Sequence, residues 1–460
     1  MIPGSESLDR TLKLEIDEGR ASTLEEAAAI VGRYRLAIVV GPGLENSTTR
    51  QAMLATALNA APRAFKGGVF VKTLDDPRFS LPWLAGRRLS EIVPQFGAVL
   101  VEELPDALTI AVGDVAIGAN VVGPTWQGWA GGVVVEGVDR LAESQENPLA
   151  GVLAGALSVS ECFQRVRGSL RAGRRAVGLS LWRPDLPWTI PEAVGPALRR
   201  LPSRYWLAGL GHLGQAYAWA IGCLPYGDPS TVDLVLQDID MVRQANSATG
   251  LLIAAGTADR QKTRVVADAL EQLGFRTAIV ERLFDDGTRR RLAHPAEPGV
   301  LLTGFHDGAS RRFLEGRGFN LVVDGGLGAG PHGYLGIRVH RFPSQLRADV
   351  VFAQPLSPIV LDPLAAPAYR AEIDRRLATG ESEAEIRCGL LEVAGRTVAA
   401  AFVGATAGTI VLGEVLRELH GGSRFALVDL HLASPDDAQA VPDTSHTEPI
   451  NPGHTPAVGQ

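Results

Sequence analysis

The fold is decided by a glycine-containing stretch near the middle of the chain, Tyr205-Trp206-Leu207-Ala208-Gly209-Leu210-Gly211-His212-Leu213-Gly214. Its apolar start predicts a buried strand, and the apolar-rich run over 215–222 predicts a helix. The glycines have G-x-G-x-x-G spacing: the first permits a tight turn, the second lets a phosphate approach the backbone, and the third lets helix and strand pack closely. Because a helix N-terminus attracts anions, we expect a nucleotide site here.

Carboxylates and a lysine follow this turn. A second predicted strand, over 232–240, ends in Asp238 and Asp240, which share one face because strand side chains alternate. An acidic residue about 20 positions after the glycines is where a ribose hydroxyl is held, in NAD enzymes and ATP enzymes alike. Asn246 and Lys262 separate these classes. Lys262 falls near the start of a predicted helix, where a cation is unfavourable unless an anion such as a triphosphate lies nearby; the alternative is a solvated surface lysine.

Composition limits the classes of protein. A chain of 460 residues favours two domains, and 46% hydrophobic with 21% charged residues is typical of globular cores. A net charge of −7 argues against a broad nucleic-acid surface. Three cysteines far apart indicate a reducing compartment, without a disulfide framework or zinc pair. Cys162 and Cys223 lie in apolar helical patterns, which predicts core packing. We find no membrane-spanning run or leader and expect a cytoplasmic protein.

A short pattern occurs twice, as G-x5-E-x-[F/L]-x2-[V/L]-x-G, over 155–168 and 408–421. The alternative is a chance match of two amphipathic helices, but each copy closes an α/β stretch of similar length. The first half also has a strand followed by Gly41-Pro42-Gly43-Leu44, where Pro42 removes a backbone donor and no third glycine follows. We therefore predict two Rossmann-like α/β units, the first degenerate and the second nucleotide-binding. The predicted boundaries are a first domain over 1–170, a linker over 171–200, a second domain over 201–432 and a disordered tail over 433–460.

The order of motifs in the second half is similar to that of the ubiquitin-activating-enzyme superfamily, the ThiF/MoeB-like adenylyltransferases. In that family a glycine loop precedes D-x-D, an Asn-containing segment, a Lys, a segment ending in Arg, a glycine-rich turn and a Cys before the last long helix. The first half resembles the degenerate partner domain of two-domain activating enzymes. The matching positions here are Gly209/Gly211/Gly214, Asp238/Asp240, Asn246, Lys262, His306-Asp307-Gly308-Ala309-Ser310-Arg311, Val323 to Gly330, and Cys388.

The resemblance implies an activity. ATP with Mg²⁺ would bind at the glycine loop, with its ribose on Asp240; Lys262 would contact the phosphates, and Asn246 would help to place them. Asp307 would bind the magnesium ion. The C-terminal carboxylate of a ubiquitin-like or sulfur-carrier protein would attack the α-phosphate, and positioning and charge stabilisation would carry the catalysis. Cys388 would then take the acyl group as a thioester or persulfide. A conjugating enzyme and a homodimer are further expected partners, whereas nucleic acid and membrane are not.

The chain departs from the family pattern at two places. The Arg expected three residues after the Asn is Thr249, and Arg243 or Arg260 would substitute for it. The register places His306 at the magnesium position, although a one-residue deletion restores Asp307, the interpretation we favour.

Two further roles stay open in the sequence. Arg33, Arg35 and Arg50 are candidates for an arginine finger. Cys388, beside Arg387 and ahead of a predicted helix, is either a reactive thiol or a small buried residue.

Three hypotheses follow. The first is an activating enzyme that adenylates a small carrier protein. The second is an NAD(P)-dependent oxidoreductase, which explains neither Asn246 and Lys262 nor the glycine-rich turn. The third is an inactive scaffold, suggested by Thr249 and His306. The motif order favours the first.

Overall fold

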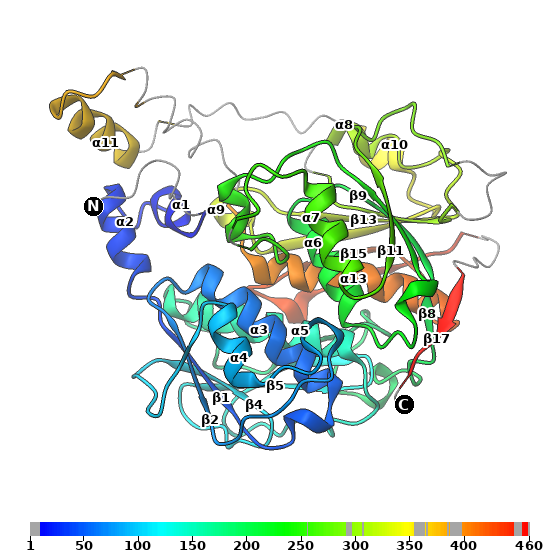
Figure 1. The fold of residues 1–460 in the computed structure, drawn as a ribbon, viewed down its shortest axis with the longest axis horizontal. Helices are drawn as coiled ribbons and strands as arrows, with labels where there is room; N and C mark the ends of the chain where they lie inside the picture. Colours follow the sequence, from blue (N-terminus) through cyan, green and yellow to red (C-terminus); the bar gives the residue numbers. More distant parts are fainter. Residues whose placement is uncertain are drawn as a thin grey trace.

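Seven strands of the first half form one sheet, and eight strands of the second half form another. The computed structural model describes residues 10–254, 256–290, 297–305, 308–353, 364, 367–383, 386, 398–445 and 453–458. Helices pack on both sheets (Figure 1), so the predicted α/β class with parallel strands is confirmed.

The first sheet has the order β3-β2-β1-β4-β5-β6-β7. Neighbours from β3 to β5 pair in parallel, and β6 and β7 add in antiparallel fashion. The strands are β1 (Leu36–Val40), β2 (Val69–Thr73), β3 (Val99–Leu100), β4 (Leu108–Val112), β5 (Val121–Gln127), β6 (Ala130–Val134) and β7 (Val177–Ser180). Because β7 belongs to this sheet, the segment predicted as a linker over 171–200 supplies a strand of the first half.

The second sheet repeats this arrangement, with the order β11-β10-β9-β12-β13-β14-β15-β16. Pairing is parallel from β11 to β13 and antiparallel from β13 onward. The strands are β9 (Arg204–Ala208), β10 (Asp233–Gln237), β11 (Arg276–Val280), β12 (Val300–Thr303), β13 (Leu321–Leu327), β14 (Gly336–Phe342), β15 (Phe425–His431) and β16 (Gln439–Pro442). In each sheet the order reverses beside the first strand, β1 or β9, and ligands of open α/β sheets bind at the carboxyl end of such a point.

Long helices fill the space between the two sheets. In Figure 1, α5 and α13 lie between the strands of the first half and those of the second, and they pack against α3 and α6. All four helices are largely buried. The helices are α1 (Arg10–Asp17), α2 (Leu24–Val31), α3 (Thr48–Ala64), α4 (Leu89–Gln95), α5 (Pro148–Val166), α6 (His212–Cys223), α7 (Lys262–Glu271), α8 (Gly308–Arg311), α9 (Gly330–Gly333), α10 (Ala348–Val351), α11 (Pro367–Ala378) and α13 (Ala401–Leu419).

The sequence repeat falls on α5 and α13, which both have 19 residues, with the first glycine of the pattern in the same helical position. A Cβ on Gly155 would lie 2.3 Å from the Met53 carbonyl oxygen of α3, and one on Gly408 would lie 3.0 Å from the Ala216 carbonyl oxygen of α6. The glycine therefore lets each long helix approach the helix that follows its half's glycine turn. This close approach gives the repeat a physical cause.

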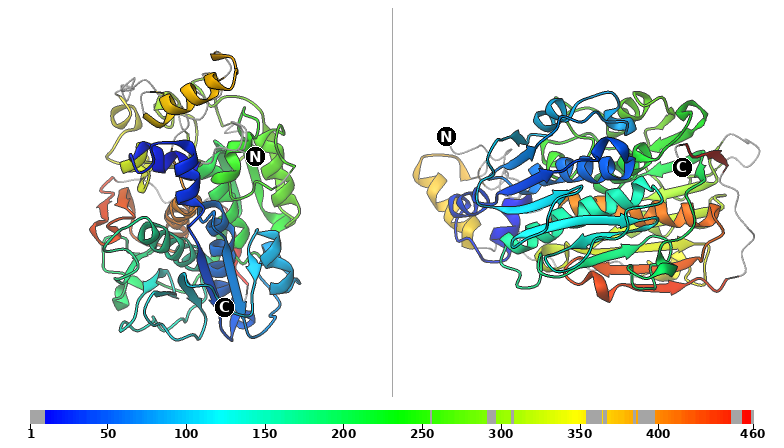
Figure 2. Two further views of the ribbon diagram at one scale, coloured as in Figure 1. Left: turned by 90° about the vertical axis from the view of Figure 1, so that its left-hand side faces the viewer. Right: turned by 90° about the horizontal axis from the view of Figure 1, so that it is seen from below.

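The N-terminal helices reach across to the second half. Helix α1 packs against α9 and against η6 (Gln244–Ala248), a 3₁₀ turn, while α2 packs against α11. Figure 2 shows these helices together at one end of the molecule.

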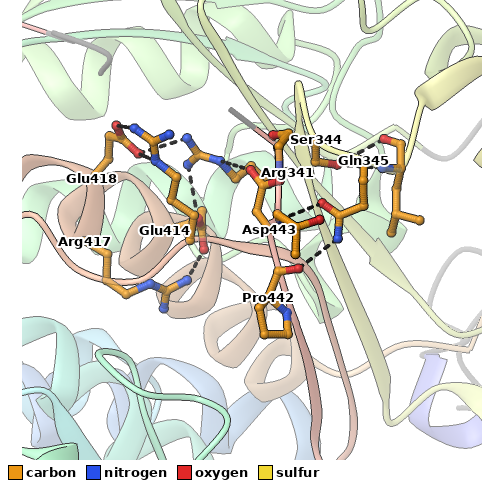
Figure 3. Close-up of polar contacts among 12 residues, drawn as sticks. Arg341, Ser344, Gln345, Glu414, Arg417, Glu418, Pro442 and Asp443 are labelled. Atoms are coloured by element: carbon orange, nitrogen blue, oxygen red, sulfur yellow. Dashed lines mark hydrogen bonds and ion pairs between the residues drawn. The ribbon is translucent and has the colours of Figure 1, made fainter. Parts of the chain in front are cut away.

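The tail predicted to be disordered forms structure where it is described. Strand β16 extends the second sheet, and β17 (His454–Pro456) pairs with β8 (Arg200–Pro202). Figure 3 shows how a buried arginine, Arg341, anchors this tail: it contacts Glu414 at 3.1 Å, Glu418 at 2.9 Å and Asp443 at 3.6 Å. The prediction was wrong for these residues because backbone pairing and a buried charge hold a segment that has few large apolar side chains.

Candidate functional site

The second glycine turn has the geometry that its spacing predicts. Gly209 has φ +83°, a left-handed conformation that favours glycine, and a Cβ on Gly214 would lie 2.1 Å from the Gly209 carbonyl oxygen. Gly211 precedes the first residue of α6, and a Cβ built on it would meet no atom within 4 Å. The first and third glycines thus close the turn, while the second leaves open space at a helix N-terminus without a side-chain cap.

Asp238 holds this turn from the neighbouring strand. Its Oδ2 accepts a hydrogen bond from the Leu210 amide at 2.6 Å, and its Oδ1 accepts one from the Asp240 amide at 2.7 Å. Both carboxylate oxygens therefore bind backbone, so Asp238 joins the glycine turn to the loop after β10.

Asp240 and Lys262 form an ion pair beyond that loop. The Nζ of Lys262 lies 2.7 Å from Asp240 Oδ2, and the lysine side chain is 11% exposed whereas the aspartate side chain is 64% exposed. Lys262 was predicted near the start of a helix and is the first residue of α7; its amide donates to the Asp240 carbonyl at 3.0 Å. A largely buried cation thus lies beside an accessible carboxylate.

Asn246 lies in a loop over 243–254 that includes η6. Its Oδ1 accepts a hydrogen bond from the Arg243 amide at 2.8 Å, which caps the turn. Thr249, at the position of the family's arginine, is buried. The two proposed substitutes face other partners: Arg243 pairs with Asp259, 3.3 Å away.

Arg260, the other substitute, pairs with Asp268 at 2.5 Å, and both side chains are nearly half exposed. The structure therefore places both arginines in surface ion pairs.

The sequence analysis missed residues of the first half that contact this loop. From α3, Asn59 Nδ2 donates to the Leu251 carbonyl at 3.0 Å, and Arg63 Nη2 donates to the Ile253 carbonyl at 3.2 Å. Arg63 Nη1 also donates to the Ser247 carbonyl. The signal available in the sequence was an asparagine and an arginine four residues apart in an alanine-rich segment.

His212, the first residue of α6, lies against the start of α13. A Cβ on Gly404 would be 2.3 Å from its Nε2. Burial, together with the nearby Arg10 and Arg63 guanidinium groups, lowers the pKa of His212 to about 3. The imidazole is therefore neutral, and two arginines from the first half are close enough to influence its pKa.

A second polar group joins the carboxyl end of β12 to the middle of β13. Thr303 Oγ1 donates to Asp324 Oδ1 at 2.6 Å, and Arg311 Nη2 donates to the carbonyls of Phe305 at 2.7 Å and Gly325 at 3.1 Å. Burial raises the pKa of Asp324. Arg311, which closes the predicted acidic segment, therefore connects the segment after β12 to the middle of β13, beside the switch point.

Several predicted residues cannot be placed with this group. His306, Asp307 and Cys388 lie outside the described residues. Cys162 and Cys223 are free and buried, as predicted, and burial raises the pKa of both thiols.

The arginine-finger candidates lie elsewhere in the first half. Arg33 and Arg35 are exposed, and Arg50 pairs with Glu143 at 2.7 Å. In the part of the chain that the structure describes, no group of three His, Cys, Asp or Glu side chains could hold a metal ion. Likewise, no described helix is long and apolar enough to cross a membrane.

Comparison with known families decides the relationship. A model of the BilD C-terminal domain matches residues 201–422, and a model of the BilD N-terminal domain matches residues 35–181. The bacterial E1-like protein BilD of Collimonas sp. (strain OK412) is 36% identical over 458 residues, which cover 98% of this chain and 96% of that protein. The chain belongs to the BilD family of bacterial E1-like proteins.

This membership of the BilD family confirms the predicted E1-like relationship and leaves the degeneracy of the first half as an interpretation. Among solved structures, the crystal structure of E. coli MccB is similar with a TM-score of 0.34 and 10% identity, over 71% of this chain and 94% of that one. A TM-score of this size carries no statement about fold or function.

Proposed function

We propose that this chain uses ATP to adenylate the C-terminal carboxylate of a small ubiquitin-like or sulfur-carrier protein. Membership of an E1-like family is the observation that carries the proposal. The first half would then be the degenerate unit of the pair, and the second half the nucleotide-binding unit.

The residues around the second glycine turn fit a nucleoside triphosphate. Phosphates would lie over Gly211, where the backbone leaves open space at the N-terminus of a helix. Lys262 would stabilise their charge, and Asp240 would turn toward the ribose because its carboxylate is accessible. Asp238 would keep the turn closed around them through its bonds to backbone amides. Asn246 would help to place the phosphates.

The reaction makes one bond and breaks one. A carboxylate oxygen of the carrier protein bonds to the α-phosphorus, and the bond between that phosphorus and the bridging oxygen breaks, which releases pyrophosphate. A carboxylate is a weak nucleophile beside a polyanion, so the chain's contribution is alignment and positive charge. Mg²⁺ would supply further positive charge, with Asp307 as its protein ligand. Transfer of the acyl group to Cys388 is a separate part of the proposal, as is a conjugating enzyme as a later partner.

Binding of ATP tests the site without a known carrier protein. We expect Lys262→Ala to weaken binding of a non-hydrolysable ATP analogue at least tenfold, and to lower pyrophosphate exchange with a cognate carrier about 100-fold, as loss of a charge-stabilising group does. Arg276→Ala is the matched control, because it removes a 2.7 Å ion pair to Asp233 at the opposite end of β10.

Two other outcomes would revise the function. Tight binding of a nicotinamide cofactor with no binding of ATP would favour an oxidoreductase. ATP binding without exchange for any carrier protein would favour an inactive scaffold. The cytoplasmic location and the homodimer stay proposals that fractionation and light scattering would test.

A further inference from the structure

Helix α3 of the first half presents polar side chains to the second half along one face. Thr56, Asn59 and Arg63 have the spacing that places residues on the same side of a helix. Thr56 Oγ1 accepts a hydrogen bond from Trp219 Nε1 of α6 at 3.0 Å. Asn59 is 3% exposed, although the residues around it in α3 are mainly alanine and leucine. A buried asparagine needs a partner, and here the partner is the Leu251 carbonyl of the other half.

Asn59 and Arg63 bind the 243–254 loop through its backbone. They donate to three carbonyls of this loop, those of Ser247, Leu251 and Ile253. Arg63 also binds Asn59 itself, with Nε 3.2 Å from the asparagine Oδ1. The two side chains therefore form one unit, and its contacts depend on loop conformation rather than on loop side chains.

The same loop is connected to the glycine turn from the other side. Gln215 of α6 accepts a hydrogen bond from the Leu252 amide at 3.1 Å and donates to the Leu210 carbonyl at 3.2 Å. Leu210 is the residue whose amide binds Asp238. A continuous series of hydrogen bonds thus runs from α3 of the first half, through the loop, to the turn that we assign to the phosphates.

We propose that Asn59 and Arg63 are positioning residues, through which the first half holds the 243–254 loop in the conformation that binds a nucleoside triphosphate. The inference deepens the proposed function and rests on it. The loop carries Asn246 and connects the Asp240 region to Lys262, so a change in its position moves the groups around the phosphates.

This role explains the missing arginine. The family pattern has an arginine at the position of Thr249, which is buried in this chain. Arg63 brings a guanidinium to the same loop from the other half of the molecule. The planar guanidinium of Arg63 donates hydrogen bonds to two carbonyls at once, and a lysine ammonium group does not reproduce this geometry.

Two measurements on the full chain test the proposal. In the ligand-free protein, Arg63→Ala should increase amide hydrogen exchange over 244–253 without a similar increase in β1 or β9. In titrations with a non-hydrolysable ATP analogue, Arg63→Ala should raise Kd about tenfold, and Arg63→Lys should recover part of that loss. Asn59→Ala should act in the same direction. Arg88→Ala, which removes an exposed ion pair at the start of α4, is the control and should change neither measurement.

The possible results distinguish a failure of the positioning role of Arg63 from a failure of the proposed ATP site. Unchanged exchange over 244–253 in Arg63→Ala would overturn the positioning role, and so would faster exchange with an unchanged Kd. If the wild type binds no ATP analogue, the proposed function fails and the nucleotide part of this inference fails with it. Faster exchange in the ligand-free variant would then still show that α3 holds the loop. If Arg63→Ala does not fold, Arg63→Lys and Asn59→Ala give the same comparison.

Discussion

The glycine turns of the two halves differ in how the helix after each turn begins. In the second half, α6 begins directly after Gly211, no side chain caps it, and the space over Gly211 is open. In the first half, a 3₁₀ turn over Leu44–Asn46 separates the glycines from α3, and Ser47 caps the helix through the Arg50 amide at 3.1 Å. The helix N-terminus after the first turn is therefore capped by a side chain of this protein, whereas the one after the second turn has no side-chain cap and open space for a ligand.

Acidic side chains complete this closure of the first turn. Glu146 accepts hydrogen bonds from the Thr49 amide at 2.8 Å and the Thr49 hydroxyl at 2.6 Å, at the N-terminus of α3. Glu143 pairs with Arg50, whose Nη1 would lie 2.7 Å from a Cβ on Gly43. A carboxylate and a guanidinium thus lie where an anion would approach. A cavity of about 400 Å³ lies beside them, between the ends of β1 and β4, where the strand order of the first sheet reverses.

The largest effect should come from the glycine that closes the second turn. In Gly214→Ala the new Cβ would meet the Gly209 carbonyl oxygen at 2.1 Å, so α6 and the turn must separate. We expect ATP-analogue affinity to fall about 100-fold and the free energy of unfolding to fall by about 2 kcal/mol, as overpacking does. Calorimetric titration and urea unfolding measure the two quantities.

The first turn has no third glycine to match Gly214, so Gly43→Ala, a substitution at its second glycine, is the comparison. It strains a positive φ of +84° and meets the movable end of Arg50, so we expect about 1 kcal/mol of lost stability and no change in ATP affinity. Equal loss of affinity in both variants would show that the turns are not functionally different.

Sequence reasoning reached the parts of this fold that depend on local pattern. The glycine turn, the strand that leads to Asp238 and a helix with Lys262 near its start all follow from spacing and hydrophobic periodicity. The helical repeat was also visible, and its glycines mark where α5 and α13 approach other helices. These features depend on residues close together in the chain.

The contacts between halves could not be predicted in the same way. Asn59 and Leu251 are 192 residues apart, and the bond joins a side chain to a backbone carbonyl, which leaves no complementary residue in the sequence. The tail was misjudged for the same reason, because Asp443 is held by Arg341 from a distant strand. The low apolar content of the tail suggested disorder, but apolar content gives no information about a single buried ion pair.

The next largest effect should come from the carboxylate that binds the N-terminus of α3 in the first half. Glu146→Ala removes the acceptor of the Thr49 amide and hydroxyl, and Thr49 is fully buried, so its donors lose their partner. We expect the free energy of unfolding to fall by about 2 kcal/mol, the usual cost of losing a cap and leaving buried polar groups unsatisfied. Urea unfolding measures it. ATP affinity should stay at the wild-type value, since the first turn is assigned no nucleotide; weakened binding would contradict that assignment.

The last prediction concerns the titration of His212 at the second turn, an effect that appears only when the pH is lowered. His212 has a pKa near 3 in the folded chain and about 6.5 when unfolded, so below pH 6.5 the unfolded state binds more protons and stability falls as the pH falls. At pH 5 this amounts to about 2 kcal/mol relative to neutral pH. His340 and His420 also have lowered pKa values and act in the same direction, so the wild type should lose stability steeply on acidification.

His212→Gln should remove about 2 kcal/mol of that pH dependence. The quantity to compare is the difference in unfolding free energy between pH 7 and pH 5, because the substitution also alters packing against Gly404 at every pH. His454→Gln, at an exposed position of β17, is the control and should leave the difference unchanged. Parallel curves for wild type and His212→Gln would mean that the imidazole is not held neutral. Burial is the main cause of the lowered pKa, so the test measures chiefly how completely the packing against α13 excludes water from the imidazole.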